Sequence, residues 1–91
     1  MLWLISYDVA DDGRRGRVHE TLKNYGRRVQ FSVFECELSE GQLETLGKRL
    51  RFVLDEAEDS CRLYRICQAC LAETTVMGRP DPPGLPRFLV I

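Results

Sequence analysis

Apolar positions in the first part of the chain follow first the spacing of a strand and then that of a helix. Residues 2–9 are almost continuously apolar, which is typical of a central strand covered on at least one face. Asp11 and Asp12 follow as candidate N-caps, and a helix is expected over about residues 14–24. Its narrow apolar face would be formed by Val18, Leu22 and Tyr25, at i, i+4 and i+7.

The next apolar segment is long for a single strand. Gly26 is expected just after the helix as its C′ residue, and residues 28–38 then alternate between two faces. We expect a kink near residues 30–32, because a strand of this length is unusual. Ser39 and Gln42 fit a capping box, in which the two residues satisfy each other's backbone amides at a helix start. The apolar face of that helix would be formed by Leu43, Leu46, Leu50, Val53 and Leu54.

The last third of the chain predicts a hairpin and a proline-rich arm. After the acidic run 55–59, which we interpret as a loop, strands are expected at 61–67 and 70–77. Residues 79–86 hold all four prolines, so they predict an extended arm without a hydrogen-bonded ladder of its own. Residues 87–91 are apolar again, and we expect this tail to pair with a sheet edge, reaching a partner subunit through the arm.

This order of elements is typical of an α+β sandwich, an antiparallel sheet with two helices on one face. The nearest common plan is the ferredoxin-like order βαββαβ. It divides the chain into a ferredoxin-like domain over residues 1–78 and an arm with a C-terminal strand over residues 79–91. A chain of 91 residues buries only roughly 60–70% of its unfolded surface, so an oligomer would add stability.

Charge narrows the candidate functions. Lys and Arg number 13 against 14 Asp and Glu, and a net charge of −1 excludes a uniformly basic protein. The balance hides opposed regions, since residues 9–30 hold six basic and three acidic residues and residues 55–91 hold four and six. No apolar run reaches the roughly 18 residues that cross a bilayer, and the start lacks the basic region of a signal peptide. We therefore expect a cytoplasmic protein without a membrane partner.

Asp8 is the candidate catalytic residue. A carboxylate that ends an apolar strand is costly to bury unless it is paired or bound to a metal. The local pattern alone favours a turn or helix-cap residue, because Asp11 and Asp12 follow closely. One carboxylate is a poor site for Mg²⁺, but a two-fold dimer could place two copies of Asp8 together.

The candidate phosphate ligands are six basic residues around the first helix and its exit: Arg14, Arg15, Arg17, Lys23, Arg27 and Arg28. A solvated helix face explains this cluster equally well. The preponderance of Arg favours nucleic-acid binding, because a guanidinium grips a phosphate with two parallel hydrogen bonds. Their position directly after Asp8 would put metal and phosphate ligands on one surface.

The cysteines and the single histidine suggest no site. Cys67 and Cys70 form a CxxC pair, but Cys36, Cys61 and His19 do not complete it with the spacing of zinc ligands. The pair also falls on a predicted β-turn and not at a helix N-terminus, where a thiol would be acidified. We therefore interpret the cysteines as small hydrophobic residues and His19 as a surface residue.

Several short motifs at a fixed spacing resemble one known family. They are the strand end Tyr7-Asp8-Val9, the pair Asp11-Asp12, the helix start Arg15-x-Arg17, residues 25–35, residues 64–67 and residues 76–78. Over nearly the whole chain the sequence resembles the Cas2 family, the second of the two universal CRISPR-associated adaptation proteins. The resemblance implies a prokaryotic protein of antiviral defence.

The resemblance further implies a ferredoxin-like homodimer whose C-terminal strands are added to the sheet of the other subunit. The aspartate matching Asp8 faces its twin and is associated with cleavage of phosphodiester bonds that depends on Mg²⁺, or on Mn²⁺ in its place. Substrates in the family are single-stranded RNA or double-stranded DNA. The dimer also bridges copies of a larger adaptation integrase and holds spacer DNA. Further positions that match functional ones are Tyr7, Arg15, Arg17, Arg28 and Phe34.

Residues and resemblance together give a mechanistic hypothesis. Two Asp8 carboxylates hold one metal ion, which activates a water for phosphodiester hydrolysis. Phosphates would be bound by Arg14, Arg15, Arg17 and Arg28, with Tyr7, Ser32 and Phe34 in supporting roles. The alternatives are a catalytically silent DNA-binding scaffold of spacer integration, or a toxin-type ribonuclease of the related virulence-associated family.

Overall fold

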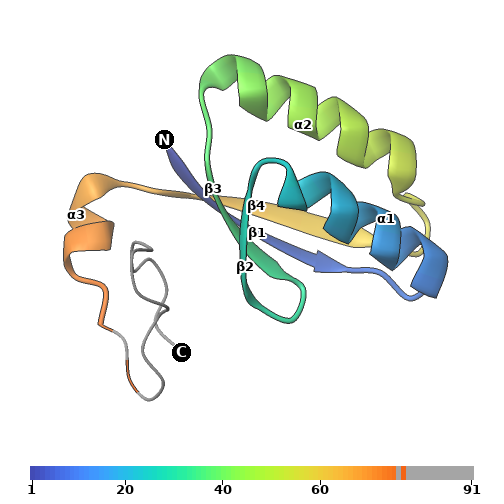
Figure 1. Ribbon diagram of the computed structural model, residues 1–91, viewed down its shortest axis with the longest axis horizontal. Helices are drawn as coiled ribbons and strands as arrows, with labels where there is room; N and C mark the ends of the chain where they lie inside the picture. Colours follow the sequence, from blue (N-terminus) through green and yellow to red (C-terminus); the bar gives the residue numbers. More distant parts are fainter. Residues whose placement is uncertain (76, 78–91) are drawn as a thin grey trace.

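A four-stranded antiparallel sheet carries two helices on one face, as the computed structural model shows for residues 1–75 and 77, the part of the chain described here (Figure 1). The elements are β1 (Leu2–Asp8), α1 (Asp12–Lys23), β2 (Gly26–Gln30), β3 (Val33–Glu37), α2 (Glu40–Val53), β4 (Ser60–Ile66) and α3 (Gln68–Ala72). The strand order is β2-β3-β1-β4, with every neighbouring pair antiparallel. The α+β class and the order βαββαβ are therefore confirmed.

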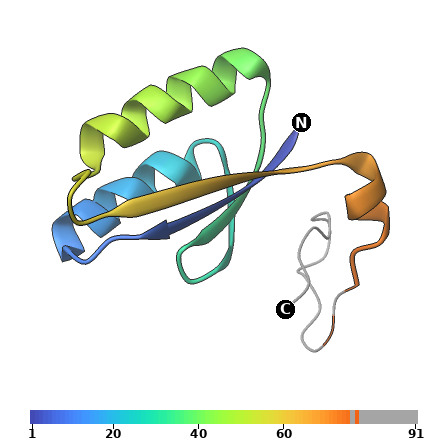
Figure 2. The same cartoon turned by 180° about the vertical axis from the view of Figure 1, so that it is seen from behind.

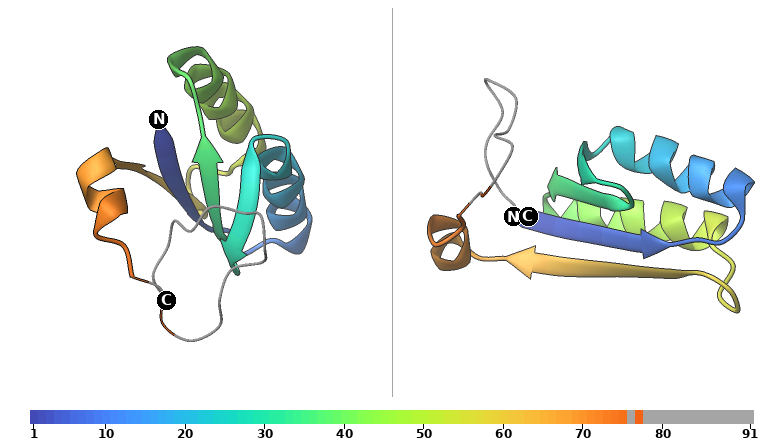
Figure 3. Two further views of the ribbon diagram at one scale, coloured as in Figure 1. Left: turned by 60° about the vertical axis from the view of Figure 1, so that its left-hand side comes forward. Right: turned by 90° about the horizontal axis from the view of Figure 1, so that it is seen from below.

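Strand β1 lies in the middle of the sheet because its apolar residues are covered by the helices. It pairs with β3 on one side and β4 on the other. Ile5 and Tyr7 are buried on the helix side, where Val18 and Leu22 of α1 and Phe34 of β3 join them in the core. Figure 3 shows both long helices on the same side of the sheet.

Helix α1 begins where an aspartate satisfies its first turn. The Asp11 carboxylate accepts a hydrogen bond from the Arg14 backbone amide at 2.8 Å, so Asp11 is the N-cap and Asp12 is the first helical residue. The expected Gly26 C′ position is wrong, because Asn24 caps the helix and Gly26 opens β2. A glycine is needed there because a Cβ would collide with the Glu35 carbonyl oxygen of the adjacent strand.

The long segment 28–38 folds into a hairpin of two strands. The chain turns at Phe31 and Ser32, and Ser32 adopts the left-handed region with φ 66°. The register between β2 and β3 also shifts between Arg28 and Gln30, which marks a bulge. The kink expected near residues 30–32 is therefore confirmed.

Helix α2 follows its sequence signals closely. Ser39 and Gln42 form the capping box, with the Ser39 amide donating to Gln42 Oε1 at 2.9 Å and the Gln42 amide donating to Ser39 Oγ at 3.2 Å. Leu46 and Leu50 are buried against the sheet. The helix ends at Val53, and the acidic run after it is a loop, as expected.

The chain departs from the prediction after β4. No strand pairs with β4 as a hairpin within the described residues, and the expected strand at 70–77 is wrong, because Gln68–Ala72 form the short helix α3. The Cys67 sulfur caps this helix by accepting the Cys70 backbone amide. Figure 2 shows α3 beyond the end of the sheet, away from α1 and α2. The predicted arm and tail strand, residues 79–91, lie outside the described residues.

Within the described ranges, no helix combines the length and apolar character needed to cross a membrane.

Candidate functional site

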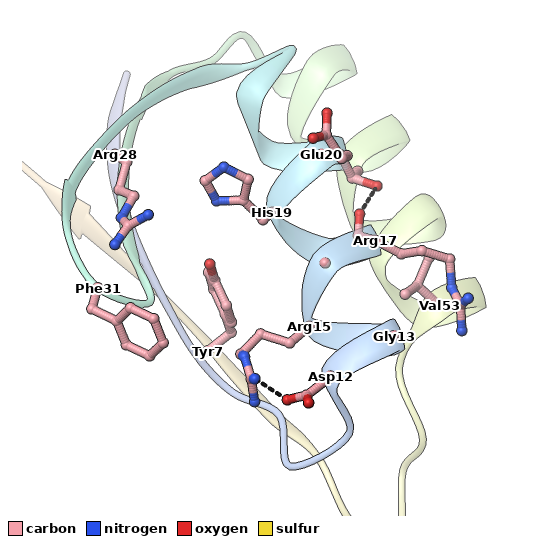
Figure 4. Close-up of a pocket in the computed structure, with 12 residues that line it drawn as sticks. Tyr7, Asp12, Gly13, Arg15, Arg17, His19, Glu20, Arg28, Phe31 and Val53 are labelled. Carbon is pink, nitrogen blue, oxygen red and sulfur yellow. Dashed lines mark hydrogen bonds and ion pairs between the residues drawn. The ribbon is translucent and has the colours of Figure 1, made fainter.

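An open groove of about 720 Å³ runs beside α1, where the helix faces the β2–β3 hairpin. Figure 4 shows how residues from β1, α1 and the hairpin converge on it. We call it the basic groove, and its defining residues are Tyr7, Arg15, His19, Arg28 and Phe31. Arg17, Asp12 and Glu20 also line it. The guanidinium groups of Arg15 and Arg28 lie beside aromatic rings, which is a combination suited to the phosphates and bases of nucleic acid.

Arg28 and Phe31 form the exposed rim of the groove on the hairpin. The Arg28 guanidinium carbon lies 5.4 Å from the centre of the Phe31 ring, a cation–π distance. Phe31 is 71% exposed, so most of its ring is open to solvent. The strand bulge and the left-handed turn at Ser32 place both side chains at the tip of the hairpin. Sequence reasoning missed Phe31, although an aromatic residue beside a turn and an arginine was a usable signal.

Tyr7 and Arg15 form the inner wall of the groove. Tyr7 is buried, and its hydroxyl points into the groove between Arg28 and His19 (Figure 4). Burial raises the pKa of Tyr7, while the positive charges of Arg28 and Arg15 act against that rise. Arg15 is held in place, since its Nη1 donates to the Val9 carbonyl at 3.0 Å and its Nη2 pairs with Asp12.

The two other supporting residues act through packing and backbone. Phe34 is fully buried, and the centre of its ring lies 6.3 Å from that of Tyr7 and 5.3 Å from that of His19, so it packs against both rings. The Ser32 carbonyl accepts the Tyr7 backbone amide at 3.0 Å, which ties the turn to β1. His19 is therefore not a plain surface residue, because it is half-buried and lines the groove.

Arg14 does not line the groove with Arg15 and Arg28, whereas Arg17 does line it but points away from the other two arginines. Arg14 Nε donates to Asp59 Oδ2 at 2.7 Å and Nη2 donates to Glu58 at 3.2 Å, which ties α1 to the loop before β4. The hydrogen bond with Asp59 raises the pKa of Arg14 further. Arg17 is exposed and is directed towards Val53, on the far side of α1 from Tyr7 (Figure 4).

Asp8 stands exposed at the end of β1. Within the described part of the chain its carboxylate makes no ion pair and no side-chain hydrogen bond. The neighbouring acidic residues are both engaged, Asp11 as the N-cap of α1 and Asp12 with Arg15. The interpretation of Asp8 as the cap residue is therefore wrong, and its carboxylate is available for a ligand.

Asp8 and the basic groove lie on opposite faces of the sheet. Tyr7 and Val9 are buried on the helix side, and successive side chains of a strand point to opposite faces. Asp8, between them, points to the outer face and lies opposite Ser60 of β4 in the ladder. The expectation that metal and phosphate ligands share one surface is therefore wrong.

The donor chemistry of Asp8 fits a hard divalent cation, which prefers carboxylate oxygen and keeps several waters. Among the residues that the structure describes, however, no group of three or more His, Cys, Asp or Glu side chains could hold a metal ion. The described part of one chain therefore offers Asp8 without a full set of protein ligands, and a second copy or a substrate could supply the rest.

Comparison with known proteins matches nearly all of the described chain to a single protein family. Residues 1–74 match the family model described as CRISPR associated protein Cas2. "CRISPR-associated endonuclease Cas2 2" of Thermus thermophilus is 48% identical over 90 residues, which cover 99% of this chain and 96% of the relative. "CRISPR-associated endoribonuclease Cas2 3" of Synechocystis is 43% identical over 86 residues, covering 91% of this chain and 94% of the relative.

Solved structures agree with the sequence relatives. The crystal structure of Streptococcus pyogenes Cas2 at pH 6.5 superposes with a TM-score of 0.76 at 31% identity, covering 86% of this chain and 100% of that one. A chain of a partial Cas6-RT-Cas1–Cas2 complex has a TM-score of 0.72 at 25% identity, with 93% of each chain covered.

Proposed function

The chain belongs to the Cas2 family of CRISPR-associated proteins, and on that premise we propose that it serves CRISPR adaptation as a metal-dependent endonuclease and a dimeric nucleic-acid-binding scaffold. The observation that carries the nuclease proposal is the exposed carboxylate of Asp8 at the end of a central strand, which no side chain among the described residues engages. Curated relatives named endonuclease and endoribonuclease support the same activity. The substrate is RNA or double-stranded DNA.

The catalytic centre is shared between two copies of the chain. One Asp8 from each copy would hold a single Mg²⁺, or Mn²⁺ in its place, because the described residues of one chain contain no cluster of three or more metal-ligating side chains. The metal, when bound, supplies Lewis-acid polarisation of a phosphate oxygen and a more acidic water. The part of Asp8 is to fix the cation at the end of β1, where the exposed strand end leaves room for a phosphodiester.

Substrate binding is the task of the basic groove. Arg15 and Arg28 present guanidinium groups for phosphate oxygens, and the exposed ring of Phe31 offers a face on which a base can stack. Arg17 adds positive charge on the far side of α1, whereas the guanidinium of Arg14 is already engaged by acidic side chains. Phosphate contacts predict binding that ignores sequence and falls steeply with salt.

A catalytically silent scaffold is the second candidate function. It is supported by the separation of the basic groove and Asp8 onto opposite faces of the sheet. Groove residues and Asp8 point away from each other, so binding does not require the carboxylate. The larger adaptation integrase is the partner that this role needs, and a structural relative solved within a Cas1–Cas2 complex supports it. In the homodimer the C-terminal strand would be added to the sheet of the other copy.

The deciding experiment measures cleavage of single-stranded RNA and duplex DNA with and without Mg²⁺. Asp8→Asn should lower metal-dependent cleavage by at least about 100-fold, since it removes a metal ligand while keeping the side-chain shape. Glu37→Gln is the matched control, because it removes the same charge from another exposed carboxylate of the sheet. Equal cleavage by wild type and Asp8→Asn would refute the nuclease centre. If cleavage is absent throughout while duplex binding persists, the scaffold function replaces it.

A further inference from the structure

Cys67 and Cys70 form a pair of exposed thiols at the junction of β4 and α3. Their sulfur atoms lie 3.3 Å apart, and the Cys70 backbone amide donates to Cys67 Sγ at 3.4 Å. The interpretation of these residues as small hydrophobic side chains is wrong for this pair, because both are exposed to solvent. A disulfide bond is about 2.05 Å long, so the two sulfurs need to approach by little more than about 1 Å.

The remaining cysteines show what a structural thiol looks like in this fold. Cys36 is buried in the core and Cys61 is half-buried, and burial raises the pKa of each to about 11. The reactive form of cysteine is the thiolate, so these two side chains stay protonated and unreactive near neutral pH. They serve as internal references for any reactivity of the exposed pair.

The exposed pair is also electrostatically unequal. Hydrogen bonds from the Cys70 backbone amide and then from its thiol lower the pKa of Cys67, whereas the hydrogen bond to Cys67 raises the pKa of Cys70. Such an arrangement is typical of a CxxC pair in which the first thiol attacks and the second resolves. The predicted β-turn had argued against this chemistry, and the structure replaces that turn with α3.

We propose that Cys67 and Cys70 are a redox-active dithiol site, which a low-molecular-weight disulfide oxidises to an intramolecular disulfide. The Cys67 thiolate attacks one sulfur of the oxidant, forms a mixed disulfide and releases one thiolate. Cys70 then loses its proton and attacks Cys67 Sγ, which releases the second thiolate and closes the Cys67–Cys70 bond. Two electrons pass to the oxidant, and its two thiolates take up the two protons lost by the pair.

Closure of this bond would covalently fix the first turn of α3 to the end of β4. The oxidised pair therefore locks the direction in which the chain leaves the sheet. A zinc site is a poorer use of the same thiols, because a structural zinc needs four ligands. No third ligand of suitable type stands near the pair among the described residues. The dithiol is separate from Asp8 and from the basic groove, so the inference does not rest on the proposed function.

The test incubates the purified reduced chain with oxidised glutathione and follows each thiol by alkylation and peptide mass spectrometry. Wild type should lose two hydrogens as a Cys67–Cys70 disulfide, while Cys36 and Cys61 stay alkylatable. Cys70→Ser should accumulate a stable glutathione adduct on Cys67, because the resolving thiol is gone. Cys67→Ser should react about tenfold more slowly, since the attacking thiolate is lost. Cys61→Ser is the matched control and should behave as wild type.

Three results would overturn the proposal. The first is a pair that stays reduced at millimolar oxidised glutathione while a denatured sample reacts. The second is reaction of Cys36 or Cys61 at the rate of Cys67 in the folded chain. The third is protection of both thiols by one equivalent of Zn²⁺ without any disulfide forming in its absence.

Discussion

The Asp8 site at the end of β1 and the basic groove differ in how many contacts within one chain fix their side chains. Groove side chains are held in place by their surroundings: Arg15 donates to the Val9 carbonyl, and the buried Phe34 ring packs against the rings of Tyr7 and His19. Asp8 has no such neighbour within the described residues. The groove side chains are thus preorganised within a single copy, whereas the metal centre proposed at Asp8 would be complete only with a metal and a second chain.

The alternation of a strand enforces this division. Tyr7 and Asp8 are adjacent in sequence, yet one faces the helices and the other the outer surface. A nucleic acid bound in the groove is therefore not automatically placed at Asp8. If the groove binds nucleic acid and Asp8 takes part in cleavage, as proposed, the two functions are separable, and variants on each face can test them independently.

The strongest test asks whether the outer site needs two copies. A hybrid dimer, purified through two different affinity tags, would combine one wild-type copy with one copy that carries Asp8→Asn. If one metal is shared, cleavage by the hybrid should fall about 100-fold, as in the full variant. A hybrid with half the wild-type rate would show that each copy cleaves independently. Binding of duplex DNA should be unchanged in either case, which filter binding can measure.

Arg28→Ala tests the basic groove, and it should weaken binding while leaving cleavage nearly unchanged. Loss of a guanidinium that contacts phosphate should weaken binding about tenfold and reduce the salt slope by about one unit. Cleavage at saturating substrate should stay within about twofold of wild type, because Asp8 is untouched. Arg49→Ala on α2 is the matched control, since Arg49 is exposed and does not line the groove. An equal loss in both variants would show that net charge, not the groove, decides affinity.

Phe31→Ala separates single-stranded from duplex substrates. Stacking on an exposed aromatic ring is worth roughly 1–3 kcal/mol per base, so affinity for single-stranded RNA should fall by about fivefold or more. Duplex affinity should not change, because paired bases are not free to stack. Phe52→Ala is the control, since Phe52 is 93% exposed on α2 outside the groove. Fluorescence anisotropy with labelled strands would detect the difference, and an equal effect on the duplex would exclude base stacking.

Elements were predictable where short-range hydrogen bonds decide them. The capping box at Ser39 and Gln42 and the aspartate cap of α1 act within three residues, so sequence alone located both helix starts. The prediction for the segment after β4 was wrong because its residues suit either a strand or a helix, and the Cys67 sulfur, by capping α3, favours the helix. The spacing of apolar residues along the chain does not reveal a cap of this kind.

Site residues were harder because their contacts are distant in sequence. Arg14 and Arg15 look equivalent in the sequence, yet Arg14 meets Asp59, which is 45 positions away, and leaves the groove. The packing of α1 against the sheet decides which arginine remains available. The opposite orientation of Tyr7 and Asp8, by contrast, was readable from strand alternation alone.

The smallest expected effect concerns the boundary of the groove, where Arg14 ties α1 to the loop before β4. The hydrogen bond from Arg14 lowers the pKa of Asp59, so the pair stabilises the fold above the unfolded pKa near 4. This stabilisation should be lost as pH falls through the lower folded pKa of Asp59. Urea unfolding at several pH values should show a weaker acid dependence in Asp59→Asn, but not in Glu56→Gln.

Nucleic-acid affinity of Asp59→Asn should remain at the wild-type level, since the pair lies outside the groove. A marked change in affinity would mean that freeing Arg14 adds a phosphate ligand. In that event the loop before β4 would decide whether Arg14 has a structural or a binding role. Its acidic residue Asp59 would then lower the affinity of the protein for nucleic acid by engaging Arg14.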